Sequence, residues 1–422
     1  MLDQVVPRWV VRIDLRWVWA AVAAGVLVWV AVRVPHGGSL DLRVYLAGGE
    51  ALWSGEGLYG PDFPGPRGLP FTYPPFAAAL FGLLAPLPLV VAAVAWAAAG
   101  IVLFTLACQV AVSRAAAPGT VPRAGFGLAA ACLLLEPVRG GLDLGQVNLV
   151  LLGLVALDCL LPRTPWPRGL LVGLAAAVKL TPAVFVLFFL CRGRWRAVAT
   201  AVAAFAGCAA VGWVLAPGES RRFWFDAVLD PQRVGGLAYT ANQSLRGLLV
   251  RAQAPESLWV VLCAAVVAVL LLVLPRLRDD LTAVVAVAVT GLLVSPVSWS
   301  HHWAWVALAV PLLHGRVRVA VVLLFAAGVH WWLPKEADRE LRWTWWQHLA
   351  GNAYVWLGLA FLSWCFMRTR KVACTQEWRL LSAASTDAEE NGHAGQGNRV
   401  QHGVRAEGGE LVAGVRPGGG AA

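Results

Sequence analysis

The chain has 422 residues, of which 59% are hydrophobic and only 14% are charged. This composition excludes a soluble globular protein and favours a polytopic membrane protein, because the chain is long enough for many spans. The net charge of +10 would suit a nucleic-acid-binding protein, but the basic residues lie in short loops and at the ends of apolar segments, where arginines set membrane topology. The eight cysteines include no CxxC spacing, so neither a disulfide framework nor a metal site is indicated.

The two ends of the chain differ from its apolar middle. Three arginines among the first sixteen residues precede an apolar run at 17–34, which is long enough to span and has no small-residue cleavage site after it. After about residue 368 the sequence becomes polar and Gly-rich, with too little apolar surface to order itself. The expected parts are a cytoplasmic N-terminus (1–16), a transmembrane catalytic domain (17–368) and a disordered cytoplasmic tail (369–422).

The stretch after the first apolar run combines an acid with helix and turn signals. Asp41 opens a segment ending at Trp53 whose apolar residues fall roughly on one helical face, which predicts a short helix lying on the membrane. Glycines and prolines then predict a turn-rich linker, and Pro74 and Pro75 predict an extended entry into the next apolar run. Asp41 is therefore a candidate catalytic residue at a membrane surface, with a solvated helix cap as the alternative.

Apolar segments recur along the chain and predict an all-α polytopic membrane protein with about 10–12 transmembrane or re-entrant helices, several of them too short to span upright. Arginine clusters assign the cytoplasmic side by the positive-inside rule. The predicted segments are 17–34, 76–112, 124–136, 147–161, 169–190, 197–215, 257–275, 281–297, 303–313, 317–333 and 351–367. The predicted outer loops are 35–75, which bears the short interfacial helix, 137–146, 216–256, 297–302 and 334–350.

The segment at 169–190 is flanked at both ends by arginines of the kind that mark cytoplasmic loops. A single crossing would break the alternation of sides along the rest of the chain. The pattern therefore predicts two half-helices that turn near Lys179 and Pro182, with the turn facing the outer side. The polar motifs of the chain then all face the same side.

Lys179 itself lies nine residues into this apolar run. An ammonium at membrane depth costs about 2.5–3.5 kcal/mol on insertion scales, so a counter-charge is expected. That counter-charge is either a phosphate or a protein carboxylate such as Asp143 or Glu136.

Two adjacent histidines, His301 and His302, follow Pro296 among several tryptophans at a predicted helix start. An interfacial aromatic belt explains the tryptophans but not the histidines, which can donate to an anionic group or relay a proton. Metal ligation by the pair is not expected, because adjacent residues do not share a helical face.

Amides and arginines lie near two further predicted helix starts. They either cap these helices and form a solvated surface, or they bind substrate hydroxyls and phosphate. Asn242 also opens a match to the glycosylation sequon, which is a common chance match. Three more arginines give the large outer loop a positive potential suited to an anionic lipid headgroup, with a solvated surface as the alternative. The amides are Gln146, Asn148, Asn242 and Gln243, their arginines are Arg139 and Arg246, and the loop arginines are Arg221, Arg222 and Arg233.

Six motifs, in order, closely resemble those of the polyprenol-phosphate-mannose-dependent α-1,2-mannosyltransferases, which form glycosyltransferase family 87 and have the GT-C membrane fold. The resemblance covers about residues 17–367. The motifs are DLRVYLAGG (41–49), FTYPPFAA (71–78), EPVRGGLDLGQVN (136–148), GLLVGLAAAVKLTPA (169–183), RVGGLAYTANQSLRG (233–247) and SPVSWSHHWAW (295–305).

The resemblance implies an extracytoplasmic active site in a multi-pass plasma-membrane protein, and the arginine pattern predicts that both termini are cytoplasmic. The donor it implies is polyprenyl-phosphate-mannose, used in an inverting single displacement with Asp41 as general base. The implied acceptor is a mannosylated lipid, either a phosphatidylinositol mannoside or lipomannan and lipoarabinomannan. A lone acid fits the members thought to need no metal, and no cofactor is expected because the donor is a substrate.

The hypothesis that follows gives each candidate residue a role beside Asp41. The alternatives are a GT-C transferase of another polyprenyl-phosphate sugar, such as arabinofuranose, and a lipid or sugar transporter or flippase. The residues expected to bind the donor phosphate are Lys179, His301, His302 and Arg139. The residues expected to bind substrate are Tyr73, Gln146, Asn148, Asn242, Gln243 and Arg246.

Overall fold

The computed structural model describes residues 14–115, 123–335 and 337–370. Contacts divide the chain into the units Met1–Phe366 and Met367–Ala422, and of the second the structure describes only the end of one helix. The predicted N-terminus and tail therefore lie almost entirely outside the described residues.

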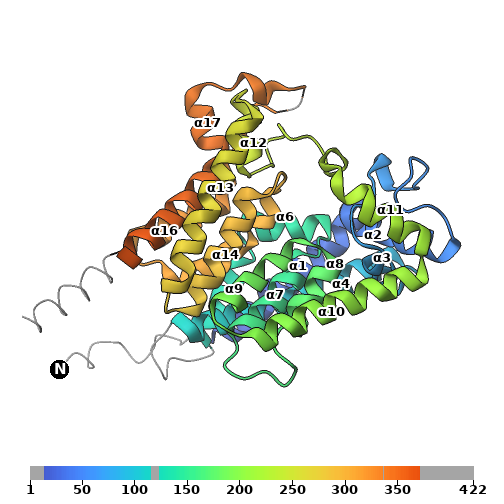
Figure 1. Ribbon diagram of the computed structural model, residues 1–422, viewed down its shortest axis with the longest axis horizontal. Helices are drawn as coiled ribbons and strands as arrows, with labels where there is room; N and C mark the ends of the chain where they lie inside the picture. The colour runs from blue at the N-terminus through green and yellow to red at the C-terminus, as the bar shows by residue number, and fades with distance from the viewer. Residues whose placement is uncertain (1–13, 116–122, 336, 371–422) are drawn as a thin grey trace, which may run out of the picture. The chain divides into compact units, whose positions relative to one another are not determined.

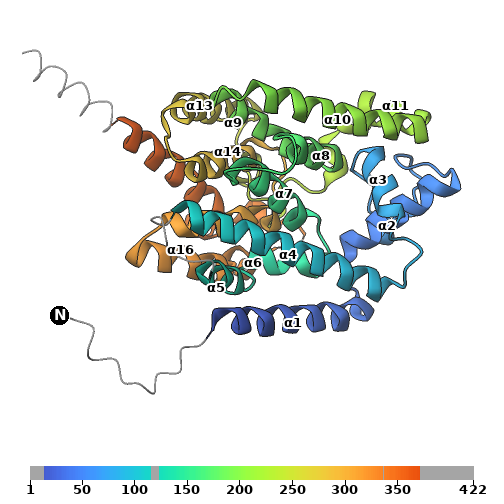
Figure 2. The same cartoon turned by 90° about the horizontal axis from the view of Figure 1, so that it is seen from below.

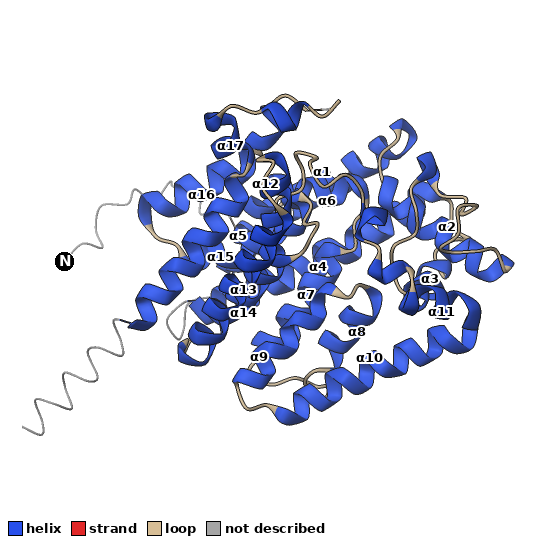
Figure 3. Cartoon of the chain, turned by 45° about the horizontal axis from the view of Figure 1, so that its top comes forward, coloured by secondary structure: helices blue, strands red, loops and turns tan. Residues whose placement is uncertain are grey.

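The regular elements of the described residues are all helices (Figure 1 and Figure 3), which confirms the predicted all-α class. The only β-type contact among these residues is an isolated bridge between Asn242 and Trp299. Every predicted apolar segment contains at least one helix. The α-helices are α1 (Leu15–Arg33), α2 (Leu40–Ser54), α3 (Pro75–Gly82), α4 (Leu89–Ala115), α5 (Arg123–Cys132), α6 (Glu136–Leu144), α7 (Asn148–Leu160), α8 (Leu170–Val178), α9 (Val186–Cys191), α10 (Trp195–Leu215), α11 (Pro217–Phe225), α12 (Leu245–Arg251), α13 (Glu256–Val273), α14 (Asp280–Val294), α15 (Val306–Ala309), α16 (Gly315–Ala327), α17 (Trp345–Gly351) and a last helix at Ala353–Arg370.

Four helices of the described chain are long and apolar enough to cross a bilayer. They are α1 with a short 3₁₀ extension, α4, α10, and α13 with a similar extension. Two bent pairs, α5 with α6 and α17 with the last helix, turn by 68° and 70° and raise the number to six if each is one span. The chain is therefore a multi-pass membrane protein in which several helices are too short to cross alone.

Helix α2, which carries the candidate acid, packs closely on α3. A methyl group at Gly48 would overlap the ring of Phe71, and one at Gly49 would overlap the backbone of Gly82. Glycine is therefore required where the two helices meet. Most of the apolar face of α2 is buried against protein, and Trp53 is the main exception, at 57% exposed, so the position of this helix on the membrane stays a prediction.

The segment at 169–190 is broken where the arginine pattern predicts. Helix α8 ends at Val178, Lys179 is its C-cap with extended backbone, and a 3₁₀ turn, η3 (Thr181–Phe185), leads into α9. The residue before α8, Gly169, lies so close to the carbonyl of Ala197, near the start of α10, that a side chain would not fit. Because α10 begins directly after α9, both ends of the broken segment lie at the same end of α10, as the predicted pair of half-helices requires (Figure 3).

Three loops that the arginine pattern assigns to the inside meet at a single carboxylate. Asp280, at the start of α14, accepts hydrogen bonds from Arg192 at 2.8 Å, Arg114 at 3.1 Å and Arg194 at 3.3 Å. The end of α4 and the α9–α10 connection are thereby tied to the start of α14. Helices α2, α3 and α11 gather at the opposite end of α10 (Figure 2).

Cysteine labelling tests this topology. In a variant without the eight native cysteines, Arg163→Cys and Arg196→Cys flank the broken segment at exposed positions, and Glu56→Cys lies in the first predicted outer loop. We expect a membrane-impermeant maleimide to label Glu56→Cys on intact cells, and both flanking cysteines only after permeabilisation. Labelling of the two flanks from opposite sides would contradict the re-entrant arrangement.

Candidate functional site

Two adjoining cavities form the candidate site. The larger has a volume of about 940 Å³ and lies between α2, the loops before α3 and α12, and the segment that leads to the histidines. The smaller, of about 280 Å³, lies between α7, η3 and α14 and is lined mostly by apolar side chains. The residues lining both cavities are Lys179, Leu180, Thr181, Ser295, Val297 and His302.

Asp41 lies in the first turn of α2 and lines the larger cavity. It is not the N-cap, because Ser39 occupies that position, so the alternative of a simple cap does not apply. Burial raises the pKa of Asp41 above the ordinary value of an aspartate, and a hydrogen bond from Gln146 and the charge of Lys179 oppose part of that rise. The carboxyl group is therefore a stronger base than an exposed aspartate.

A chain of polar side chains orients this carboxylate. The Gln146 amide nitrogen donates to Asp41, while its amide oxygen accepts from the Tyr45 hydroxyl at 2.9 Å. The Tyr45 and Tyr73 hydroxyls lie 2.8 Å apart. Gln146 follows Gly145, whose φ of +69° ends α6 in contact with Leu42 of α2. The end of α6 thereby sets the direction of the Asp41 side chain.

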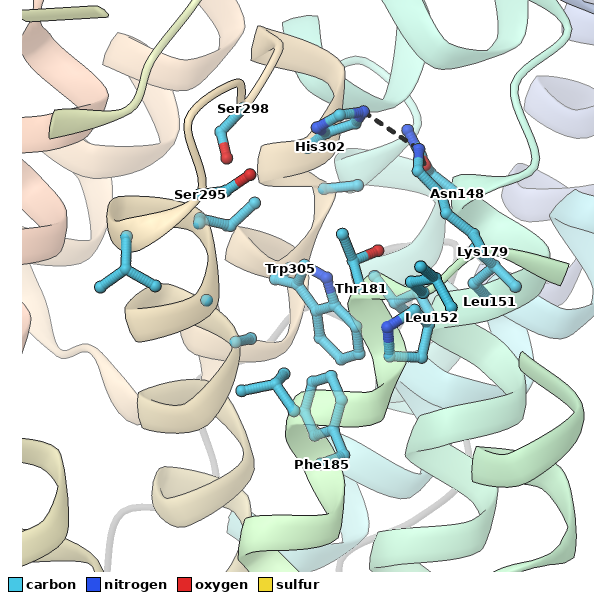
Figure 4. A pocket seen from close by; sticks show the side chains of 18 of the residues that line it. Asn148, Leu151, Leu152, Lys179, Thr181, Phe185, Ser295, Ser298, His302 and Trp305 are labelled. Atoms are coloured by element: carbon cyan, nitrogen blue, oxygen red, sulfur yellow. Dashed lines mark hydrogen bonds between the residues drawn. The ribbon is translucent and has the colours of Figure 1, made fainter. Parts of the chain in front are cut away.

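Lys179 stands where the two cavities meet. Its ammonium donates to the Asn148 side-chain oxygen at 3.2 Å and lies 3.2 Å from Nε2 of His302 (Figure 4), with the Tyr73 ring centre at 5.5 Å. Because an ammonium can only donate, His302 accepts through Nε2 and carries its proton on Nδ1. Asn148, as the first residue of α7, also donates to the carbonyl of His301 at 3.4 Å.

Neither carboxylate considered as a partner for Lys179 pairs with it. Asp143 binds Arg33 at 2.9 Å, and Glu136 is bound by side chains from other segments. No described carboxylate lies within ion-pair distance of Lys179, although the charge of Asp41 acts on it. An anionic ligand is therefore the remaining source of a close counter-charge.

The two histidines have different surroundings. Both lie on a 3₁₀ turn, η7 (Ser300–Trp305), with ring centres 4.8 Å apart and planes nearly perpendicular. His302 borders both cavities and contacts Lys179, whereas His301 borders only the larger one. Nε2 of His301 is buried and has no hydrogen-bond partner in the described chain.

Three predicted ligands do not line either cavity, so their expected roles are corrected. Asn242 bonds the carbonyls of Leu237 and Pro296 and the amide of Ser298, and Gln243 bonds the carbonyls of Thr240 and Gly351. Both amides are fully buried, so they hold the chain in front of the histidines, and the sequon at Asn242 is inaccessible. The Arg139 side chain is exposed outside both linings.

Arg246 does line the larger cavity, but protein groups already engage it. It pairs with Glu256 at 2.7 Å and lies 4.6 Å from the centre of the Trp259 ring. Sequence reasoning missed Tyr45, although it stands four residues after Asp41 and so on the same helical face. It also missed Trp299 and Trp331 as individual wall residues of the larger cavity.

Comparison with known proteins places the chain in a family. A family model described as glycosyltransferase family 87 matches residues 71–296. A polyprenol-phosphate-mannose-dependent alpha-(1-2)-phosphatidylinositol mannoside mannosyltransferase of Mycobacterium tuberculosis is 38% identical over an alignment of 381 positions, which covers 82% of this chain and 89% of that protein. The chain belongs to glycosyltransferase family 87. It is thus a glycosyltransferase, as the motifs predict.

Two further relatives of this family 87 enzyme come from Mycolicibacterium smegmatis. One has the same name as the M. tuberculosis protein and is 39% identical, covering 80% of this chain and 86% of its own length. The other is a polyprenol-phosphate-mannose-dependent alpha-(1-2)-phosphatidylinositol pentamannoside mannosyltransferase, 36% identical over 78% of this chain and 86% of its own length. No solved structure matches the chain.

Proposed function

We propose that this glycosyltransferase transfers mannose from polyprenyl-phosphate-mannose to a 2-hydroxyl of a phosphatidylinositol mannoside, forming an α-1,2 linkage with inversion. The names of the relatives support the donor and the acceptor class. The observation that carries the mechanism is that an acid held by Gln146 and a lysine without a close carboxylate partner line the same cavity. Mannose is favoured over arabinofuranose because relatives named as mannosyltransferases align with most of the chain.

In the proposed reaction the acceptor hydroxyl attacks the anomeric carbon from the face opposite the phosphate. The new bond joins the acceptor oxygen to that carbon, and the bond to the phosphate oxygen breaks. Asp41 takes the hydroxyl proton, and polyprenyl phosphate leaves with the electron pair. The Lys179 ammonium and the Nδ1 proton of His302 stabilise the charge that develops on the leaving phosphate.

The smaller cavity supports this placement of the donor. It begins at Lys179 and His302 and continues between apolar side chains, among them Leu152, Phe185 and Leu292. A phosphate bound at Lys179 would have its first isoprene units in this apolar space (Figure 4). The mannose and the acceptor would then occupy the larger cavity, where Tyr73, Trp299 and Trp331 offer aromatic faces.

The proposed side of the reaction is extracytoplasmic. The arginines that converge on Asp280 are expected to face the cytoplasm, and α2 and α3 lie at the other end of α10. A reaction without metal remains a prediction, and it rests on the sequence, in which Asp41 has no second acid of a DxD-like pair beside it, although Asp230 also lines the larger cavity. Incubation of membranes with labelled polyprenyl-phosphate-mannose and acceptor distinguishes the enzyme from a transporter. An enzyme would form a new labelled product, whereas a transporter would redistribute the lipid without new product.

The base assignment is tested by Asp41→Asn, which can still accept the hydrogen bond from Gln146 but is not basic. We expect mannosyl transfer to fall about 100-fold to 10,000-fold with the protein still folded. Asp62→Asn is the matched control, since Asp62 is an exposed acid of the same loop. Transfer by Asp41→Asn near the wild-type rate would show that another group takes the proton.

The pH dependence gives an independent test. A base must be ionised, and the raised pKa of Asp41 means that activity is lost, as pH falls, at a higher pH than for an ordinary aspartate. Gln146→Leu removes a hydrogen bond that favours the ionised form. The acid limb of the kcat/KM profile should therefore move to higher pH in this variant. An acid limb that did not move would show that it does not report the ionisation of Asp41.

Lys179→Gln tests the donor-phosphate role. Loss of a charge-assisted contact should raise the KM for the donor about tenfold or more, with little change in the KM for the acceptor. Lys335→Gln is a control. Among the described polar groups, the Lys335 ammonium binds only the Trp331 carbonyl. Unchanged donor saturation in Lys179→Gln would remove this lysine from the phosphate site.

A further inference from the structure

Glu136 is a buried carboxylate that three side chains from other segments bind. Its Oε1 accepts from the Ser300 hydroxyl and from the Trp331 indole nitrogen, both at 2.7 Å. Its Oε2 accepts from the Tyr354 hydroxyl at 2.8 Å. Glu136 is only 6% exposed, so these bonds replace its hydration.

No described arginine or lysine pairs with this carboxylate. The nearest ring nitrogen is Nε2 of His330, at 3.9 Å from Oε1, which is beyond hydrogen-bond distance. A buried carboxylate without a cationic partner is costly, and the hydrogen bonds of its three donors, together with its place at the start of a helix, offset that cost. Each donor is therefore held in a defined position relative to Glu136.

The donors differ in what they support. Ser300 is the first residue of η7, and His301 and His302 follow it directly. Tyr354 belongs to the last helix and lines neither cavity. One oxygen of Glu136 thus holds the start of the histidine turn, and the other holds a helix outside the site.

Glu136 is also the first residue of α6, whose other end leads to Gln146. The nine-residue helix packs along η7, with Gly141 facing His301. The histidine turn is therefore tied to the beginning of α6, and the partner of Asp41 follows its end. The spacing between the proposed base and the proposed phosphate ligands depends on this one short helix.

We infer that Glu136 is a positioning residue for transfer: through Ser300 it fixes the histidine turn relative to Gln146 and Asp41. This inference rests on the proposed function. Glu136 touches neither substrate and acts through the residues that do.

Two isosteric variants separate this role from a purely structural one. Ser300→Ala and Tyr354→Phe each remove one hydroxyl, and so one hydrogen bond, from the same carboxylate. We expect Ser300→Ala to lower kcat/KM for polyprenyl-phosphate-mannose about tenfold, and Tyr354→Phe to leave it within about twofold of wild type. The melting temperature should fall by similar amounts in both variants.

Substitution of Glu136 itself completes the test. Glu136→Gln keeps an oxygen for Ser300 and Trp331 and an amide that can donate to the Tyr354 oxygen, so it should retain most activity, whereas Glu136→Ala should lose it. Equal losses of kcat/KM in Ser300→Ala and Tyr354→Phe, in proportion to the fall in melting temperature, would overturn the inference. An inactive wild-type protein with this donor and a phosphatidylinositol mannoside would instead overturn the proposed function.

Discussion

The site depends on a lysine ammonium placed where an apolar helix is broken. Lys179 is the C-cap of α8 and contacts Asn148 and His302, but no described carboxylate lies within ion-pair distance of it. Charge in an apolar surrounding requires compensation, and here the protein supplies neutral polar groups in contact with the ammonium and the charge of Asp41 beyond ion-pair distance. The two cavities meet at this ammonium, so any anionic ligand that enters either of them encounters it. The acid on α2 lines the larger cavity, so a carboxyl group and an ammonium border the same space.

The geometry around this pair comes from short elements that brace one another. Glycines bring α2 and α3 into contact, Gly145 ends α6 against α2, and Gln146 then holds Asp41. Buried amides of Asn242 and Gln243 fix the chain that precedes the histidines. Helices too short to cross a bilayer thus build the site, while the helices long enough to cross it are α1, α4, α10 and α13.

Much of this arrangement could be predicted from sequence because charge and periodicity are local signals. Arginines at both ends of 169–190 gave the broken segment, and an acid directly after the first span gave Asp41. The roles expected of Asn242 and Gln243 are not met, because hydrogen-bond partners distant in sequence decide whether an amide faces a cavity or the protein. The three donors of Glu136 lie 164, 195 and 218 residues away along the chain, so no local pattern could reveal them.

The broken segment has a consequence for how the protein enters the membrane. A nine-residue helix such as α8 is about 14 Å long, which is less than half of a hydrocarbon core of about 30 Å. Neither half can therefore be recognised as a span during synthesis, and neither can leave its exposed backbone ends in lipid. The hairpin must settle as a unit against α7 and α10, the long-range neighbours that α8 contacts most. The candidate site at the turn of this hairpin therefore requires α7 and α10 to be in place beside it.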